Sequence, residues 1–286
     1  AQNMRLRLAS LIGPDAYYVQ ISTFHSFCAQ VISNHLEFFP LNPASQPITE
    51  LERFELVRSI VEELPLESVK PLNSPLFHVR SLLTNISTFK REGVTTDAFQ
   101  ELVRSQWVDP TTITSKTTAL KTAKRQQQLS EQGTVYEAYE QRLRSAGRYD
   151  FDDMLALTVA VLSREEVLLQ EYQEQYLYLL VDEYQDTNTV QNNVTRLLAS
   201  FWGEQANIFA VGDPHQSIYR FQGASLENIT QFMQWYPRTE LITLSEGYRC
   251  PRELYELAHT LIKQDTSLSS LELLGDSGTA LQSALS

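Results

Sequence analysis

The sequence predicts an α/β protein whose strands and helices alternate, interrupted by a long all-helical stretch. Three observations lead to this fold class. Short apolar runs alternate with helical periodicity after residue 147, and a strand–helix pair is predicted near residue 20. Between them, residues 48–147 keep helical spacing with little strand signal. Strands that alternate with helices favour a doubly wound layer built on a parallel sheet.

Composition narrows the class of protein. The chain has 286 residues, of which 42% are hydrophobic and 20% charged, so it can bury a core and is not a disordered tail. Its net charge is −12, whereas a protein that binds nucleic acid through its overall charge is usually basic. Any polyanion must therefore bind in a local groove. Cys28 and Cys250 match no metal spacing and are expected to be free thiols in a reducing compartment.

No targeting or membrane segment is predicted. No apolar run approaches the roughly 20 residues that a membrane helix requires, and no signal peptide is visible. The chain begins at Ala1, and its first residues already have helical character, so we expect it to be a fragment with sequence upstream.

A strand followed directly by a helix is predicted near the start of the chain. Residues 17–23, YYVQIST, are rich in β-branched and aromatic side chains and follow the turn signal Gly13-Pro14-Asp15. From Phe24 onward, apolar residues recur three and four positions apart, which predicts a helix starting where the strand ends.

Residues 48–147 are predicted to form amphipathic helices. Two apolar stripes mark them: Leu51, Phe54, Val57, Ile60 and Val61, and then Leu129, Tyr136, Tyr139 and Leu143. Within the segment 115–125, SKTTALKTAKR, four residues are basic: Lys116, Lys121, Lys124 and Arg125. Two interpretations of this run stay open, a solvated helix face or a surface that contacts phosphates.

The α/β alternation returns after Gly147. Helices are predicted over 151–162, 187–202, 226–235 and 254–262. Strands are predicted over 176–181, 208–211 and 241–244. The first two strands are continuous apolar runs, which is typical of strands buried on both faces of a parallel sheet.

Polar residues cluster where three predicted strands end. Asp182 and Glu183 end one strand, Gly212 and Asp213 end another, and Thr23 and His25 follow the first. Ligands of open parallel sheets bind at the carboxyl ends of the strands. Mg²⁺ requires only one or two protein oxygens beside a phosphate, and a neighbouring acid can activate water. A nuclease with paired Mg²⁺ is a rival, disfavoured because only Asp182, Glu183 and Asp186 cluster in sequence.

Two longer strings carry a family resemblance. They are V-D-E-Y-Q-D-T-N at 181–188 and V-G-D-P-H-Q-S-I-Y-R-F-Q-G-A at 211–224. Both resemble signature motifs of superfamily 1 DNA helicases of the UvrD/Rep/PcrA family. Further similar segments are I-S-T-F-H-S-F at 21–27, Y-D-F-D-D-M-L at 149–155 and L-S-E-G-Y-R-C-P at 244–251.

The resemblance covers most of the chain and implies a fold. It is weakest over 40–145, where such helicases insert a variable helical domain. It implies a RecA-like P-loop NTPase sheet with a large inserted all-helical domain. The implied domains are the first motor domain at 1–38 and 148–238, the inserted domain at 39–147, and the start of a second motor domain at 239–286.

The resemblance also assigns nucleotide contacts, with ATP and Mg²⁺ as cofactors. Asp182 matches the acid that coordinates Mg²⁺, and Glu183 matches the acid that activates the hydrolytic water. Gln216 matches the glutamine that senses the γ-phosphate, through an amide that donates and accepts. Arg249 matches an arginine that contacts the γ-phosphate, and Tyr248 matches the residue that stacks on adenine.

DNA contacts follow from the same motifs. Tyr219 and Phe221 match aromatic residues that face DNA bases, and base stacking contributes roughly 1–3 kcal/mol per base. Thr23, His25 and Ser26 match residues near the DNA backbone. Five residues join Gln216 to Phe221, which suggests that hydrolysis shifts a stacking residue; Phe221→Ala should then reduce unwinding more than ATP binding.

The sequence departs from the family pattern at several points. Phe221 stands where the family usually has Trp, Gln222 where it has Arg, Gly247 where it has Asn, and His215 where an acid is common. No lysine follows a glycine, so the 286 residues contain no G-x-x-x-x-G-K-[ST] loop. The family has this loop upstream of the part that resembles Ala1, and a second motor domain downstream. We therefore expect this fragment alone to hydrolyse little or no ATP.

The sequence thus predicts part of an ATP-dependent helicase that translocates 3′ to 5′ on single-stranded DNA and unwinds duplex in repair or recombination. Expected partners are single-stranded DNA, single–double-strand junctions and repair or recombination proteins, in a bacterial or archaeal cytoplasm near the nucleoid. Two alternatives stay open: the helicase part of a RecB- or AddA-like helicase–nuclease, and a DNA-binding module without catalysis. A phosphate loop upstream would exclude the latter.

Overall fold

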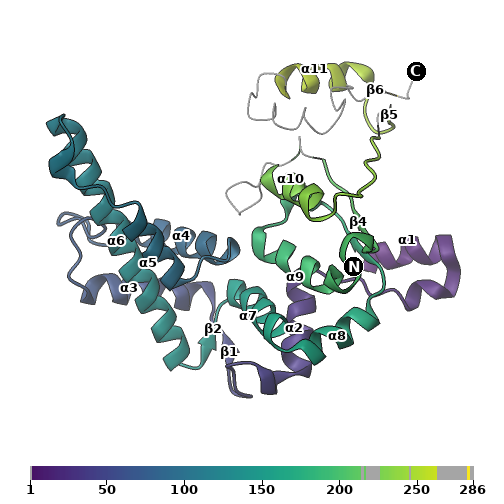
Figure 1. Cartoon of the computed structure of the whole chain (residues 1–286), viewed down its shortest axis with the longest axis horizontal. Coiled ribbons are helices and arrows are strands. Elements are labelled where there is room, and N and C mark those ends of the chain that lie inside the picture. Colours follow the sequence, from purple (N-terminus) through teal and green to yellow (C-terminus); the bar gives the residue numbers. More distant parts are fainter. Residues whose placement is uncertain (1, 214–215, 217–225, 245, 263–281, 284–286) are drawn as a thin grey trace. The chain divides into compact units, whose positions relative to one another are not determined.

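The computed structural model describes residues 2–213, 216, 226–244, 246–262 and 282–283 (Figure 1). The chain divides into two compact units. Unit 1 contains residues 1–171 and 189–197, and unit 2 contains residues 172–188 and 198–286. The division into units is based on contacts in space and does not test the domain boundaries predicted from the sequence, which stay predictions.

The start of unit 1 consists of helices joined by an irregular segment. Helix α1 (Gln2–Ile12) leads into a 3-10 turn, η1 (Gly13–Tyr17), and after an irregular stretch at 18–23 helix α2 (Phe24–Asn34) begins where the sequence predicts. The predicted strand at 17–23 is wrong: residues 18–23 have no regular structure, and the side chains of Tyr17 and Tyr18 are exposed. Local β propensity forms a strand only where a neighbouring strand is available for pairing.

Residues 48–147 are helical, as predicted. Their helices are α3 (Glu50–Glu63), α4 (Val79–Arg91), α5 (Thr96–Ser105) and α6 (Lys116–Ser145), with a 3-10 turn η3 (Pro110–Thr112) before α6. Two short strands flank the helices: β1 (Gln46–Pro47) pairs in parallel with β2 (Arg148–Tyr149). The α3–α6 region therefore leaves and rejoins the rest of unit 1 at one place.

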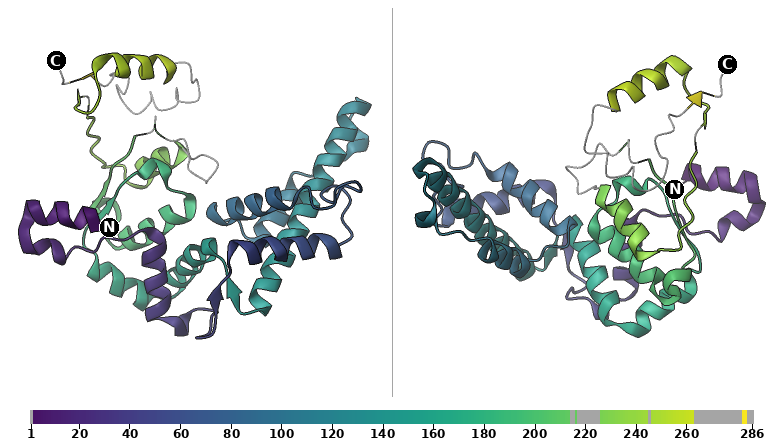
Figure 2. Two further views of the ribbon diagram at one scale, coloured as in Figure 1. Left: turned by 180° about the vertical axis from the view of Figure 1, so that it is seen from behind. Right: turned by 45° about the horizontal axis from the view of Figure 1, so that its top comes forward.

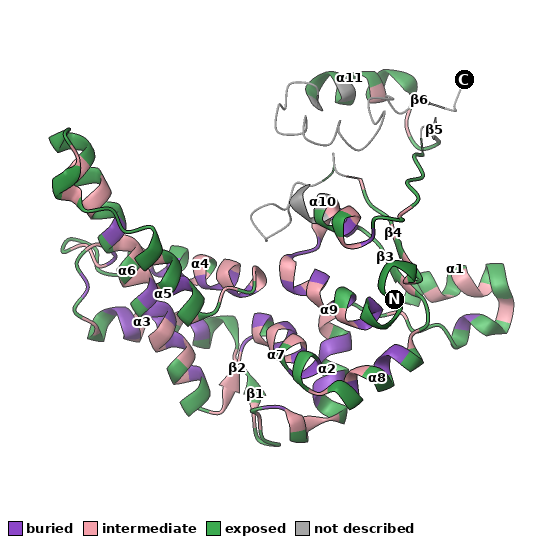
Figure 3. Ribbon diagram, viewed as in Figure 1, coloured by how far each residue is buried: buried purple, intermediate pink, exposed green. Residues whose placement is uncertain are grey.

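The α3–α6 region has its own hydrophobic core. Figure 3 shows buried residues along α3, α4 and α6. Most of the predicted stripe residues are buried in this core, whereas Phe54 and Leu129 are partly buried and Leu51 is exposed. The buried residues are Val57, Ile60, Val61, Leu66, Val69, Val79, Leu82, Ile86, Val135, Tyr136, Tyr139 and Leu143.

The rest of unit 1 is built on α7 (Phe151–Arg164), which packs against α2. Cys28 is buried at this contact, where burial raises the pKa of its thiol to about 11 despite a hydrogen bond with Thr158. Neither Cys28 nor Cys250 forms a disulfide. Helices α8 (Glu166–Gln175) and α9 (Thr189–Ala199) follow along the chain, and each contributes residues to both units.

Unit 2 contains a parallel pair of strands, β3 (Leu179–Val181) and β4 (Ile208–Ala210). One face packs on a core of Tyr184, Ala199, Phe232 and Tyr236 that α10 (Leu226–Trp235) helps to form. The expectation that both faces are buried is wrong, because Leu180 is 74% and Phe209 56% exposed. Side chains alternate along a strand, and the described sheet has a core on one side only.

The remaining described elements of unit 2 are two 3-10 turns and a group of elements near the C-terminus. The 3-10 turns η4 (Tyr184–Asp186) and η5 (Ser200–Gln205) follow β3 and α9. The predicted strand at 241–244 is wrong, since these residues have no regular structure. Instead β5 (Glu246–Gly247) pairs in parallel with β6 (Gln282–Ser283), and α11 (Arg252–Ile262), the yellow-green helix in Figure 2, lies between them in sequence.

Candidate functional site

The two strands of unit 2 bring their polar ends together. Val181 pairs with Ala210, and the ladder continues beyond the strands, since Val211 N donates to Val181 O at 2.9 Å and Tyr184 N donates to Val211 O at 2.8 Å. Asp182 and Glu183 therefore leave β3 beside the segment that leaves β4. The predicted meeting of these two strand ends is confirmed.

Glu183 holds an unusual backbone conformation. Its φ of 51° and ψ of 45° lie in the left-handed region, and it is the one non-glycine with positive φ among the described residues. This conformation turns the chain sharply from β3 into η4. Asp182 supports the turn, because its Oδ1 accepts a hydrogen bond from Glu183 N at 3.1 Å. Both acidic side chains are exposed.

Gln185 connects the two strand ends. Its side chain is only 1% exposed. Its Nε2 donates to Glu183 Oε2 at 2.7 Å, and its Oε1 accepts from Asp213 N at 3.0 Å. A buried amide needs partners for both of its polar atoms, and here the two partners come from the two strand ends.

Gly212 makes this bridge possible. A Cβ at this position would lie 2.5 Å from Gln185 Oε1 and 3.1 Å from Gln185 N. No side chain fits there without displacing the amide, so the glycine is required by close approach.

Gln216 completes a row of hydrogen-bonded residues, in which Asp213 takes part through both its backbone N–H and its carboxylate. Its Nε2 donates to Asp213 Oδ2 at 2.8 Å. Glu183, Gln185, Asp213 and Gln216 are thus joined in series, and Glu183 and Gln216 are its two exposed ends. The role of Gln185 was not predicted; its signal in the sequence is an uncharged amide placed among three acids.

The third acid of the predicted cluster differs from the first two. The pKa of Asp186 is raised by partial burial of its carboxyl group and by the nearby charge of Glu183. Its Oδ1 is buried without a hydrogen-bond partner. Asp186 therefore lies in surroundings that do not favour its charge.

The donor set suits a single magnesium ion held mainly by a nucleotide. Asp182 has one carboxylate oxygen engaged with Glu183 N, and its side chain is exposed, so an oxygen remains available to a hard cation. Across the described part of the chain, no three His, Cys, Asp or Glu side chains gather into a metal-binding group. One carboxylate beside a phosphate fits Mg²⁺ better than it fits a cation held by protein ligands alone.

In unit 1, the residues predicted to lie near the DNA backbone, Thr23, His25 and Ser26, are at the start of α2. Thr23 caps the helix: its Oγ1 accepts from Ser26 N at 3.2 Å and lies 2.9 Å from Ser26 Oγ. These residues do not follow a strand, so the prediction that they belong to the same sheet edge is wrong. They are instead the N-cap and first turn of a helix, where exposed hydroxyl groups suit a phosphate.

His25 lies flat on an aromatic neighbour. Its ring centroid is 3.7 Å from that of Phe151, the first residue of α7, and the rings are nearly parallel. Burial lowers the pKa of His25, and Arg91 lowers it as well, while Asp152 opposes both. Phe151 is 55% exposed and was not predicted as a site residue. Its aromatic type in the segment 149–155 was the available signal.

The other predicted site residues have exposed side chains or lie outside the described residues. Tyr248 and Arg249 have exposed side chains in the segment after β5. Tyr219 and Phe221 lie outside the described residues, as do His215 and Gln222. Among the contacts that the structure describes, none joins Arg249 to the row from Glu183 to Gln216.

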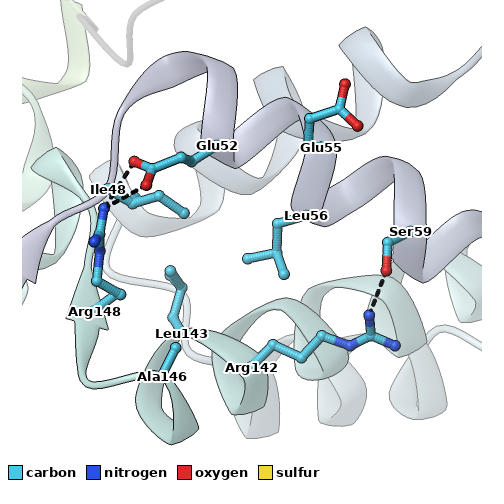
Figure 4. A pocket seen from close by; sticks show the side chains of 9 residues that line it. All are labelled: Ile48, Glu52, Glu55, Leu56, Ser59, Arg142, Leu143, Ala146 and Arg148. Atoms are coloured by element: carbon cyan, nitrogen blue, oxygen red, sulfur yellow. Dashed lines mark hydrogen bonds and ion pairs between the residues drawn. The ribbon is translucent and has the colours of Figure 1, made fainter.

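A surface pocket of about 500 Å³ lies elsewhere, between α3 and α6 (Figure 4). Apolar side chains line its floor, and ion pairs close its edges, among them Arg148 with Glu52 at 2.7 Å. None of the predicted site residues lines it. This pocket is therefore separate from the residues that carry the predicted chemistry.

Comparisons with known proteins give the family. Residues 1–237 match the model of the UvrD/REP helicase N-terminal domain. The ATP-dependent DNA helicase PcrA of Bacillus subtilis is 29% identical over 267 residues, which cover 93% of this chain and 32% of the relative. The ATP-dependent DNA helicase UvrD1 of Mycobacterium bovis is 31% identical over 286 residues, 97% of this chain and 34% of the relative.

These matches cover nearly all of this chain but only part of each relative. The chain spans about a third of the length of the curated relatives it matches. No described helix is long and apolar enough to cross a membrane. Because the domain model matches from residue 1 to residue 237, the chain belongs to the UvrD/Rep helicase family.

Proposed function

We propose that this chain is part of an ATP-driven DNA helicase and that the ends of β3 and β4 are its nucleotide site. The observation that carries the proposal is the hydrogen-bonded row from Glu183 through Gln185 and Asp213 to Gln216. It joins the segment after one strand to the segment after the next, at the edge where parallel sheets bind ligands.

Each acid has a separate task in this proposal. Asp182 ligates the Mg²⁺ that accompanies ATP and neutralises phosphate charge. Glu183 accepts a proton from the attacking water. Asp182 holds its left-handed backbone and Gln185 holds its carboxylate, so the carboxylate keeps one position during proton transfer. Strain at a functional acid is consistent with this role.

The other nucleotide contacts come from later segments. Gln216 senses the γ-phosphate, and its link to Asp213 transmits that contact to the end of β4. Arg249 stabilises charge on the transferred phosphoryl group, and Tyr248 stacks on adenine. Their exposed side chains are available for such contacts.

Single-stranded DNA is proposed to bind along the start of α2. Thr23 and Ser26 offer hydroxyl groups to the backbone, and His25 with Phe151 offers an aromatic pair with one exposed member. Tyr219 and Phe221 are proposed to stack on bases. The α3–α6 region at 39–147 is proposed as an inserted domain, with motor segments at 1–38 and 148–238 and a second motor domain from 239.

We also propose a direction of movement, a DNA substrate and a cellular setting for this motor. The motor would move 3′ to 5′ and open single–double-strand junctions, in repair or recombination, within a bacterial or archaeal cytoplasm. This setting rests on the relatives, which are named as ATP-dependent DNA helicases of bacteria.

The test replaces Glu183 with Gln in the intact gene product. ATP turnover is measured with and without single-stranded DNA, and nucleotide binding is measured separately. Loss of a general base should lower turnover by about 10²- to 10⁴-fold with binding retained. Thr189→Ser, on the helix that follows, serves as the control. Unchanged turnover in the Glu183→Gln variant would reject the assigned role.

A further inference from the structure

Two consecutive basic residues at the end of α4 hold the first turn of α7. Lys90 Nζ lies 2.7 Å from Asp150 Oδ2, and Arg91 Nε donates to Asp152 Oδ1 at 2.9 Å. Both acids are buried, and they are the residues directly before and after Phe151. A buried carboxylate requires a partner of this kind. The backbone of Phe151 is therefore fixed on both sides by α4.

The same ion pairs lie close to the ring on which Phe151 stacks. The ring centroids of Phe151 and His25 are 3.7 Å apart. Burial lowers the pKa of His25, while the charge of Asp152 raises it and the charge of Arg91 lowers it. The pair of Arg91 with Asp152 thus acts on the stacked rings themselves. The end of α4 is connected in this way to the residues proposed to bind single-stranded DNA.

The next residue of α4 binds a different segment. Glu92 is half-buried, and its Oε2 accepts a hydrogen bond from the hydroxyl of Thr189, the first residue of α9. Gly93 has a φ of 70°, and a Cβ there would lie 3.6 Å from Val190 Cγ2, so the turn after α4 also runs close to α9. In sequence, Thr189 comes three residues after Asp186, the last residue of η4.

The two attachments begin at adjacent residues, so they move together. Lys90, which precedes them, is buried and lies 2.6 Å from both Glu140 Oε1 of α6 and Asp153 Oδ1 of α7. The end of α4 is therefore anchored, and Arg91 and Glu92 have little freedom to move apart. Ion pairs and hydrogen bonds that meet on one rigid element can carry coupling between two sites.

We propose that Arg91 and Glu92 are positioning residues that couple the DNA side of this motor to its ATP site. Arg91 fixes the start of α7, which carries Phe151. Glu92 fixes the start of α9, which continues the chain from the segment of Asp182 and Glu183. Single-stranded DNA that binds at the stacked rings shifts the start of α9 through this connection and raises ATP turnover. This inference rests on the proposed function, because it assigns residues through which DNA stimulates that reaction.

The experiment measures ATP turnover of the intact gene product with and without single-stranded DNA and takes the ratio of the two rates. Thr189→Val removes the hydroxyl that Glu92 binds and keeps a β-branched side chain. Its ratio should fall about fivefold or more, the range typical of coupling between sites. Turnover without DNA and the KM for ATP should be unchanged. Thr189→Ser keeps the hydroxyl and should keep the native ratio.

Arg91→Gln breaks the other attachment and should lower the ratio by a similar factor. Combined with Thr189→Val, it should lower the ratio no further than the larger single loss, because either break disconnects the two ends. Arg58→Gln is the matched control and should keep the native ratio, since Arg58 pairs only with Glu55 and Glu62 of its own helix among the ion pairs described. Urea denaturation checks that each variant is folded, and Thr189→Val carries the test if Arg91→Gln unfolds.

The possible results separate this inference from the proposed function. A native ratio in Thr189→Val overturns the inference, whether both rates are unchanged or both fall together, because the contact then only supports the fold. Additive losses in the double variant also overturn it, because the two attachments then act independently. Both results leave the proposed function standing. An intact native product without DNA-stimulated ATP turnover rejects the proposed function and the inference with it.

Discussion

At the scale of single residues, the site depends on one strained backbone and one buried amide. A left-handed conformation costs a non-glycine residue roughly 1–2 kcal/mol. Glu183 adopts it because Asp182 Oδ1 and Gln185 Nε2 hold its backbone and side chain. The sequence identified the two acids, because their order after an apolar run is a local feature. It did not identify Gln185, because its role depends on Asp213, 28 residues away.

Gly212→Ala is predicted to displace the bridging amide. The added Cβ would meet Gln185 Oε1 at 2.5 Å, so the side chain must move or the two strand ends must separate. We expect a loss of about 1–3 kcal/mol in the free energy of unfolding, measured by urea denaturation.

A double-mutant cycle separates this clash from a general effect. Combining Gly212→Ala with Gln185→Ala removes the atom that clashes, so the two losses should not add. Additive losses would mean that the contact with Gln185 is not the cause.

At the scale of elements, the end of α4 joins the α3–α6 region to the rest of unit 1. Lys90 Nζ lies 2.6 Å from Glu140 and 2.7 Å from Asp150, and Arg91 Nε lies 2.9 Å from Asp152. The next residue, Glu92, accepts a hydrogen bond from Thr189 Oγ1, at the start of α9. Three consecutive residues thus contact α6, α7 and α9, which fixes the orientation of α4.

The cluster around Lys90 gives a pH prediction. Burial raises the pKa of Asp153 to about 7. The positive charge of Lys90 lowers this pKa, whereas repulsion from Asp150 and Glu140 raises it further. Between its ordinary pKa and about 7, the folded state binds a proton that the unfolded state does not. The contribution of Asp153 to stability therefore falls as pH rises toward 7 and is constant above it.

Asp153→Asn should remove this dependence. Unfolding by urea is measured at pH 5 and pH 8 for the native chain and the variant. The loss of stability between the two pH values should be smaller in the variant, because asparagine does not titrate. Equal losses would mean that Asp153 is ionised at both pH values.

A second prediction at this scale concerns the loop between α3 and α4. The carboxylate of Glu131 on α6 accepts hydrogen bonds from the backbone N–H groups of Glu67, Ser68 and Val69, at 2.9–3.1 Å. Glu131→Ala leaves these donors without their acceptor. We expect a loss of about 1–3 kcal/mol in urea denaturation.

Glu101→Ala is the matched control for this variant. Its ion pair with Arg104 is exposed on both sides, and such pairs contribute little. A similar loss in both variants would show that the anchor of the loop is not specific.

At the scale of the whole molecule, the prediction concerns what the 286 residues do alone. They contain no G-x-x-x-x-G-K-[ST] loop, so nothing in them cradles the α- and β-phosphates in the way that P-loop NTPases do. The isolated chain should show little or no ATP turnover stimulated by DNA, measured beside the intact gene product. Turnover equal to that of the intact product would contradict this expectation.

The sequence by itself determined the features that depend on neighbours along the chain. The start of α2 at Phe24, the helical character of 48–147 and the acids after β3 all follow from local propensity and periodicity. These features need no distant partner, so short segments are enough to predict them.

Only the tertiary structure decided what depends on pairing and burial. Residues 17–23 and 241–244 have the composition of strands and form none, because strand formation requires a partner strand. Leu180 and Phe209 are apolar and exposed, because burial depends on which face another element covers. Gln185 and Lys90 acquire their roles from partners 28 and 60 residues away, which no local pattern specifies.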